Sequence, residues 1–170
     1  FDEQNNIDWS KQLQDAGCTV FYGFDDYKVH SKLTLITSRV NGKYRYLTQI
    51  GTGNYNEKTS ELYTDLSFIT TRQEIGEEAS AVFNNMALQR LTGDVSTMLV
   101  APLHFKSVLL EEMDRQIARA MQGKPAGIIL KNNSINDPQL IEKISQASCA
   151  GVRVDMIVRG ICCVRAGVPG

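Results

Sequence analysis

The stretch KLTLITSRVNGKYRYLTQI, residues 32–50, decides the fold of the first part of the chain. Apolar and polar side chains alternate on both sides of Asn41-Gly42, a dipeptide whose backbone preferences favour a two-residue hairpin turn. We therefore predict two antiparallel strands, over residues 32–38 and 44–50, joined at this turn.

The rest of the chain alternates between helical and strand patterns. The first helix is expected to follow an N-cap at Asn6 and to end at Gly17. The other predicted helices cover residues 73–86 and 105–121, and a last one begins at Asp137 and Pro138. The other predicted strands cover residues 18–22, 65–70, 127–131 and 152–158, and a Gly/Asn/Thr-rich loop covers residues 51–63. This alternation favours a layered α/β fold.

Two stretches of the chain resemble each other. Residues 5–23 read NNIDWSKQLQDAGCTVFYG, and residues 132–160 read NNSINDPQLIEKISQASCAGVRVDMIVRG. Each has paired asparagines, an amphipathic helical pattern, small residues and then an apolar run. The similarity fits either a duplicated structural unit or the helix-then-strand alternation common to many α/β folds.

Length and composition restrict the class of protein. A chain of 170 residues fits one domain or two small half-domains, and its net charge of −1 indicates no nucleic-acid partner. The chain has no apolar run that could span a bilayer, no leader pattern and no spacing typical of a metal site. The four cysteines are expected to be reduced, in a cytoplasmic protein. Both ends are expected to be cut from a longer protein.

Positive charge gathers in one part of the chain. Residues 28–72 include seven basic and three acidic side chains. Here His30 and Lys32 stand two residues apart at the start of a predicted strand, so their side chains are expected to point to the same face. Such a pair suits phosphate chemistry, because an imidazole can attack phosphorus and an ammonium can neutralise phosphate oxygens.

A second motif, Gly51-Thr52-Gly53-Asn54, follows the hairpin. The backbone N–H groups of such a loop can cradle a phosphate, and the Asn54 amide can add a side-chain donor. A solvated histidine at a strand edge and a tight turn would account for the same residues without any function. The loop does not match the P-loop pattern, which counts against a P-loop kinase.

Together the two motifs resemble the phospholipase D-like superfamily, whose half-site reads H-x-K-x4-D and then G-S-x-N. His30, Lys32 and Asn54 match this pattern, and Thr52 replaces its serine. Thr37 occupies the aspartate position, which counts against a phospholipase or nuclease of that superfamily.

A closer resemblance, to polyphosphate kinases, explains that departure. It is carried by VHSKLTLITSR (29–39), IGTGNYNEKTSELYTDLSFIT (50–70), GKPAGIILKNNSINDPQLIEKISQASCAGV (123–152) and DMIVRGICCVRAGVPG (155–170). The resemblance implies a phospholipase D-like α/β fold, in which a mixed sheet is flanked by helices. A first catalytic half, lacking its N-terminal strand, would cover residues 1–95, and the truncated start of a second half would cover residues 96–170.

The resemblance also implies an activity. Enzymes of this family transfer the terminal phosphate of ATP to inorganic polyphosphate, reversibly, with Mg²⁺ and through a phosphohistidine, and the full-length enzymes form oligomers. His30 matches the phosphorylated position. Lys32, Asn54 and Arg159 match positions that would hold phosphate oxygens, and Tyr63 matches one associated with the nucleotide.

A nucleophilic imidazole needs its second ring nitrogen held while the first reacts. Asp65 is our candidate for this orienting role, with Glu57 as a rival. The other histidine, His104, matches no catalytic position and is interpreted as structural or exposed.

Three departures from the family pattern affect the expected activity. Gln49 stands where many family members carry a second histidine, and an amide cannot carry protons as an imidazole does. The family's phosphate-binding arginine lies upstream of this chain, and the histidine of the second half lies downstream. We therefore expect the fragment to be inactive alone. A phospholipase D-like phosphodiesterase and a non-catalytic phosphate-binding fragment are the alternatives.

Overall fold

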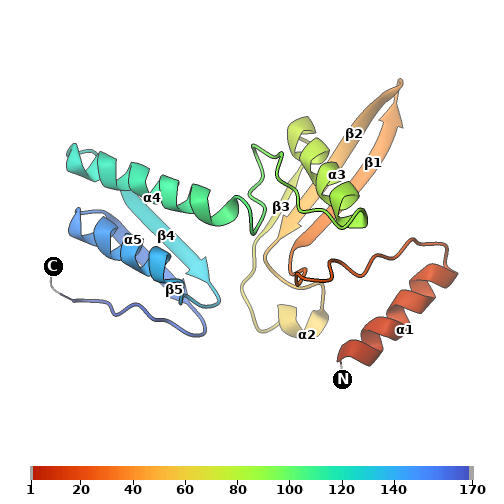
Figure 1. Ribbon diagram of the computed structural model, residues 1–170, viewed down its shortest axis with the longest axis horizontal. Helices are drawn as coiled ribbons and strands as arrows, with labels where there is room; N and C mark the ends of the chain where they lie inside the picture. Colours follow the sequence, from red (N-terminus) through yellow and green to blue (C-terminus); the bar gives the residue numbers. More distant parts are fainter. Residues whose placement is uncertain (1, 169–170) are drawn as a thin grey trace. The chain divides into compact units, whose positions relative to one another are not determined.

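The computed structural model describes residues 2–168, with the side chains of residues 6–168 (Figure 1). The chain forms two compact units, Phe1–Met98 and Leu99–Gly170. Each unit has its own sheet, one antiparallel and the other parallel, with helices packed against it. This arrangement confirms the α/β class.

The first unit is built on the predicted hairpin. Strands β1 (Lys32–Val40) and β2 (Lys43–Gly51) pair antiparallel over their whole length. Asn41 and Gly42 form the turn with φ angles of 51° and 77°, the left-handed conformation that a two-residue hairpin turn requires. The short strand β3 (Ser67–Thr70) adds to β2, giving the order β1-β2-β3. The predicted hairpin is therefore confirmed.

Helix α3 (Gln73–Ala87) packs against β2 on one face of this sheet, with contacts to β1 as well (Figure 1). Gly76 allows the close approach, because a Cβ at this position would overlap the side chain of Tyr46. Thr48 of β2 is fully buried, as is Ala79 of the helix. The helical spacing that predicted this helix is therefore the spacing of its packed face.

Two predictions at the start of the chain are wrong. Helix α1 (Asp2–Asp15) begins before the expected N-cap, so that Asn6 lies inside it. Residues 18–22 form no strand, and within the described part of the chain no strand pairs with them. An apolar run becomes a strand only where a neighbouring strand satisfies its backbone. This segment is instead tied to α1, since the Tyr22 hydroxyl donates to Ser10 Oγ at 3.1 Å.

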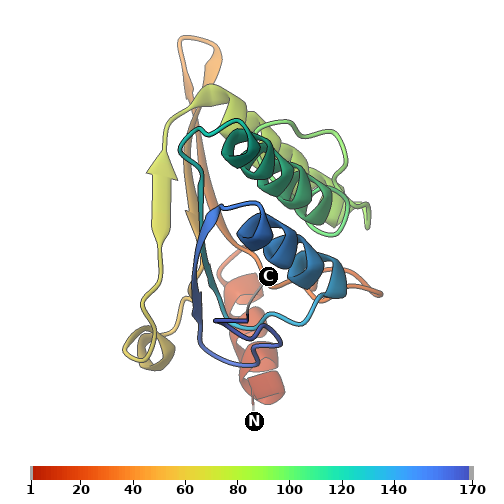
Figure 2. The same cartoon turned by 90° about the vertical axis from the view of Figure 1, so that its left-hand side faces the viewer.

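The second unit is a βαβ arrangement preceded by a helix. Strands β4 (Gly127–Asn132) and β5 (Arg153–Val158) pair in parallel, and α5 (Pro138–Cys149) connects them. Figures 1 and 2 show α5 and α4 (Phe105–Met121) side by side on one face of this pair. The buried core consists of Met113, Ile128, Ile135, Ile144, Ala147 and Val152.

The helix start in this unit follows the prediction. Asp137 caps α5, and its carboxylate accepts hydrogen bonds from the backbone N–H groups of Gln139 and Leu140 at 3.0 and 3.1 Å. Pro138 occupies the first turn, where its missing N–H costs nothing. Here the second of the two similar stretches forms both its helix and its strand, whereas the first forms only its helix. No helix among residues 2–168 is long and apolar enough to cross a bilayer.

Candidate functional site

His30 and Lys32 lie together at the start of β1. The Lys32 ammonium nitrogen is 2.9 Å from His30 Nδ1 and 3.3 Å from Nε2, and it donates to the His30 carbonyl oxygen at 2.5 Å. The lysine is buried, with 9% of its surface exposed, whereas the histidine is exposed. The structure thus brings a solvent-accessible imidazole and a sheltered ammonium side by side.

The electrostatic surroundings of Lys32 act in opposite directions. Burial lowers the pKa of Lys32, the nearby Asp65 carboxylate raises it, and Lys28 lowers it; the net result is a lowered pKa. A phosphate placed beside this ammonium would stabilise its charged form, because an opposite charge close by favours ionisation. Lys32 is therefore well suited to respond to a bound anion.

The loop after β2 is tied to the segment that leads into β3. The Thr52 backbone N–H donates to the Leu66 carbonyl at 3.0 Å, and the Leu66 N–H donates back to Thr52 Oγ1 at 2.9 Å. The Thr52 hydroxyl in turn donates to Asp65 Oδ1 at 2.9 Å. Gly53 is required here, because a Cβ would overlap the Asp65 carboxylate. These contacts close the loop over residues 53–64 at its base.

A second set of contacts joins this loop to the sheet. The Tyr55 hydroxyl donates to Gln49 Oε1, and it shares a hydrogen bond of 3.0 Å with the Thr34 hydroxyl. Gln49 Nε2 donates to Ser67 Oγ at 2.9 Å. The network spans β1, β2 and β3, since Thr34, Gln49 and Ser67 belong to these three strands. The motif analysis did not identify Tyr55, Thr34 or Ser67 as part of the site.

Asn54 lies between the two anchors, Thr52 and Tyr55, with an exposed side chain. Its backbone carbonyl accepts a hydrogen bond from the N–H of Asn56 at 2.9 Å. Asn56 in turn caps the short helix α2 (Glu57–Ser60), accepting from the Thr59 N–H at 3.1 Å. The loop conformation is therefore fixed on both sides of the exposed Asn54 amide.

The two candidate orienting carboxylates differ in their surroundings. Asp65 accepts from Thr52 and is near enough to Lys32 to affect its pKa. Glu57 is exposed in the first turn of α2. Tyr63 lies between α2 and β3 and is 38% exposed.

Arg159 belongs to the second unit. It directly follows β5 and is exposed, and its backbone N–H donates to the Asn132 carbonyl at 3.3 Å. His104 stands at the N-cap position of α4, and its Nδ1 is buried without a hydrogen-bond partner. Among the residues whose side chains are described, no group of three or more His, Cys, Asp or Glu residues could hold a metal ion.

Comparison with known proteins decides the family. The model for polyphosphate kinase C-terminal domain 1 matches residues 1–91, and that for polyphosphate kinase C-terminal domain 2 matches residues 98–170. The chain belongs to the polyphosphate kinase family. The family's two C-terminal domain models together match nearly the whole chain, as the sequence resemblance implied.

Individual polyphosphate kinases agree with this. The polyphosphate kinase of Staphylococcus haemolyticus is 41% identical over 170 residues, which are 100% of this chain and 24% of that protein. The polyphosphate kinase of Bacillus cereus is 43% identical over 169 residues, or 99% of this chain and 24% of that protein. The crystal structure of polyphosphate kinase from Porphyromonas gingivalis superposes with a TM-score of 0.84 at 29% identity, covering 98% of this chain and 28% of that chain. The chain thus spans about a quarter of the length of these relatives.

Proposed function

We propose that this chain carries the phosphate-accepting part of a polyphosphate kinase active site. The reaction is the reversible transfer of the terminal phosphate of ATP to inorganic polyphosphate through a phosphohistidine at His30. The observation that carries the proposal is the exposed His30 imidazole beside the buried Lys32 ammonium. The loop that presents Asn54 begins at Gly51, which pairs with Lys32 across the hairpin.

The proposed chemistry has two steps. In the first, a ring nitrogen of His30 forms a bond to the terminal phosphorus of ATP while the bond to the bridging oxygen breaks, and ADP leaves. In the second, a terminal oxygen of polyphosphate attacks the same phosphorus, and the imidazole leaves. Lys32 would neutralise charge on the transferred group, and the Asn54 amide would donate to one of its oxygens. Such a transfer depends mainly on positioning and charge stabilisation.

The other residues would act around this centre. Arg159 would offer a planar guanidinium to phosphate oxygens, a role that suits arginine better than lysine. Tyr63 would contact the nucleotide. Asp65 would orient His30, and its hydrogen bond from Thr52 supports a fixed position for the carboxylate.

We propose that Mg²⁺ arrives at this site with the nucleotide. The described side chains form no metal cluster of their own. Mg²⁺ in phosphoryl-transfer enzymes is commonly held by substrate phosphates with one or two carboxylates, and Asp65 is the carboxylate close to Lys32. When bound, the ion would neutralise charge on the phosphates.

The wider family features are proposals as well. We propose that residues 1–95 and 96–170 are parts of two phospholipase D-like halves. The four cysteines are free and exposed. A cytoplasmic location is a further proposal. Oligomer formation by the full-length protein is a further proposal, taken from the family resemblance.

The test uses the two histidines of the chain as a matched pair. The chain is incubated with γ-labelled ATP and Mg²⁺, alone and as a chimera in which it replaces the matching quarter of the Staphylococcus haemolyticus enzyme. We expect acid-labile, base-stable label on the chimera, its loss in His30→Ala, and its retention in His104→Ala. We expect no label on the chain alone.

Label that survives in the His30→Ala chimera, or a chimera that takes up no label, contradicts the proposal. Label on the chain alone would leave His30 as the nucleophile but would overturn the expectation that the fragment is inactive.

A further inference from the structure

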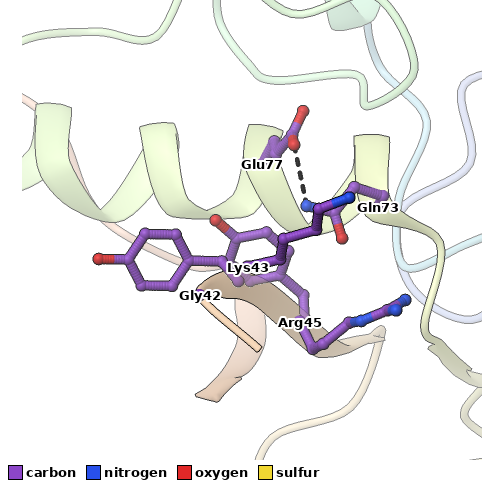
Figure 3. A pocket seen from close by; sticks show the side chains of 7 residues that line it. Gly42, Lys43, Arg45, Gln73 and Glu77 are labelled. Carbon is purple, nitrogen blue, oxygen red and sulfur yellow. Dashed lines mark hydrogen bonds between the residues drawn. The ribbon is translucent and has the colours of Figure 1, made fainter. Parts of the chain in front are cut away.

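A pocket of about 530 Å³ lies away from His30, along the edge of β2 (Figure 3). Strand β3 pairs only with residues 48–51 of β2, so the rest of this edge has no neighbouring strand in the described part of the chain. The pocket is lined by Gly42, Lys43, Tyr44, Arg45, Tyr46, Gln73 and Glu77. None of these residues belongs to the proposed catalytic site.

The charges at this pocket are mostly positive and unneutralised. Lys43 and Arg45 are exposed, and neither forms an ion pair among the described residues. Arg39, which stands opposite Tyr44 in the strand register, is also exposed and without an ion pair among the described residues. The one carboxylate that lines the pocket, Glu77, accepts a hydrogen bond from Gln73 Nε2 at 2.9 Å. In Figure 3 the Lys43 side chain extends toward Gln73, whereas the Arg45 side chain points away from helix α3.

The hairpin places Lys43 and Arg45 on the same face as Lys32, whereas Arg39 and its partner Tyr44 lie on the opposite face. Directly paired residues of antiparallel strands share a face, and Arg45 pairs with Ser38 while Lys43 pairs with Val40. Ser38 and Val40 stand six and eight residues after Lys32, so all of them point to one side of the sheet. The separation between Lys32 and the position of Ser38 is roughly 20 Å along the strand.

The hairpin itself contributes no acidic side chain to this surface. Residues 27–56 contain no aspartate or glutamate, although they include five lysines and arginines. On the shared face of β1 and β2, the side chains between the two ends are Thr34, Ile36, Leu47 and Gln49. A linear polyanion with one end near Lys32 would therefore meet no like charge from the hairpin on its way to the turn.

We propose that the tip of the β1–β2 hairpin is a second docking surface for the polyphosphate chain. The hairpin tip comprises Lys43, Arg45 and the adjacent pocket. The inference rests on the proposed function, which supplies polyphosphate as the ligand. The tip binds phosphates distant from the reacting end through the charges of Lys43 and Arg45, and it thereby retains a long chain near His30.

Protection of a free strand edge would explain the same cations differently. Charged side chains on an unpaired edge discourage pairing with a second copy of the chain. That explanation predicts self-association when the charges are removed, with polyphosphate binding unchanged. A binding experiment that also records oligomeric state therefore distinguishes polyphosphate docking from protection of the strand edge.

The test measures binding of the 170-residue chain to fluorescently labelled long-chain polyphosphate and to tripolyphosphate over a series of salt concentrations. Lys43→Gln/Arg45→Gln is compared with Lys11→Gln/Lys124→Gln, which removes the same charge from exposed positions outside the hairpin sequence. We expect the hairpin variant to bind the long chain about tenfold more weakly, with its salt dependence reduced by about two counterions. Tripolyphosphate is too short to reach the tip from Lys32, so its binding should change less than twofold, whereas the control pair should change neither.

Glu77→Gln provides a test of opposite sign. Removal of this carboxylate should tighten binding of the long chain, because a like charge is lost from the pocket. The proposal is overturned if the unmodified chain does not bind long-chain polyphosphate, if the hairpin variant binds it like the control, or if Glu77→Gln weakens binding. It is also overturned if the hairpin variant self-associates while its binding is unchanged.

This result is independent of the phosphorylation experiment. The Lys43→Gln/Arg45→Gln chimera should still be labelled at His30 by ATP. If His30 is not labelled but the tip still binds polyphosphate, only the proposed phosphohistidine chemistry is contradicted. If His30 is labelled but the tip does not bind polyphosphate, only the proposed docking surface is contradicted.

Discussion

At the scale of single residues, the candidate site depends on a few side chains that connect the loop after β2 to the sheet. Thr52 ties the loop to Asp65 and Leu66, and Tyr55 ties it to Gln49 and Thr34. Gln49 takes part in this network as both acceptor and donor, which an amide can do at any pH near neutrality. Its presence in place of the family's second histidine is therefore compatible with a structural role for this position.

Tyr55→Phe should loosen the loop without changing its apolar contacts. The substitution removes a hydroxyl that bonds to Gln49 and Thr34, and it should lower the stability of the first unit by about 1 kcal/mol. In the labelled chimera it should also slow phosphorylation of His30. Thr34→Val removes only one of the two bonds and should have the smaller effect on both. Denaturant unfolding and the rate of labelling check this, and equal effects of the two variants would contradict it.

Asp65→Asn should lower the pKa of Lys32 further. The Asp65 carboxylate raises this pKa, whereas burial and Lys28 lower it, so removing the carboxylate removes the one opposing influence. The asparagine oxygen can still accept from Thr52, which preserves the loop. An NMR titration of the lysine side chain measures the shift, and an unchanged or raised pKa would contradict this prediction. If His30 is phosphorylated at the normal rate in the same variant, Asp65 does not orient His30.

At the scale of elements, helix α3 holds residues 96–98 in place through hydrogen bonds. The Glu78 carboxylate on this helix accepts hydrogen bonds from the backbone N–H groups of Ser96, Thr97 and Met98 at 2.7 to 3.2 Å, and from the Ser96 hydroxyl at 3.2 Å. Burial alone would raise the pKa of Glu78, but these donors outweigh it and hold the pKa below its ordinary value. The side chain thus fixes the end of the first unit through charge-assisted hydrogen bonds.

Glu78→Gln should destabilise this connection in a pH-dependent way. The folded-state pKa lies below the unfolded one, so the stabilisation is fully present above the unfolded pKa of about 4.3 and is lost as the pH falls through the folded value. At pH 7 the variant should be less stable by about 1–2 kcal/mol. Amide exchange of residues 96–98 and denaturant unfolding measure this. A stability difference that persists unchanged at pH 3 would contradict it.

At the scale of the whole molecule, the chain consists of two units that each bury their own side chains. The second unit has a contiguous core between its helices and its parallel strands, in which Ile144 of α5 is 4% exposed. Ile129 of β4, by contrast, is 77% exposed, although it lies in the same strand as the buried Ile128. The alternation along β4 therefore separates a packed face from an uncovered one.

Ile144→Ala should destabilise the second unit by about 2–4 kcal/mol, because it removes buried methyl groups and leaves a cavity. Ile129→Ala removes the same atoms from an exposed position and should change stability by less than about 0.5 kcal/mol. Amide exchange of β4 and β5 reports on the second unit directly. Similar effects of the two substitutions would show that the assigned core is wrong.

Sequence patterns predicted the elements whose signals are local. The turn at Asn41-Gly42 and the spacing of α3, α4 and α5 were sufficient, because backbone preference and periodicity act within a few residues. The prediction failed over residues 18–22, where an apolar run has no strand to pair with in the described chain. The adjacency of His30 and Lys32 followed from their spacing, whereas the network of Tyr55 did not.

The sequence by itself thus determined the α/β class, the hairpin, the family and the candidate nucleophile with its neighbouring lysine. Only the tertiary structure decided which carboxylate meets Thr52, how Tyr55 reaches β1 and β2, and which edge of β2 is left open. These features join residues that lie far apart in the chain, and they depend on strand register and on the packing of α3. Periodicity describes one element at a time, so it cannot place such side chains relative to one another.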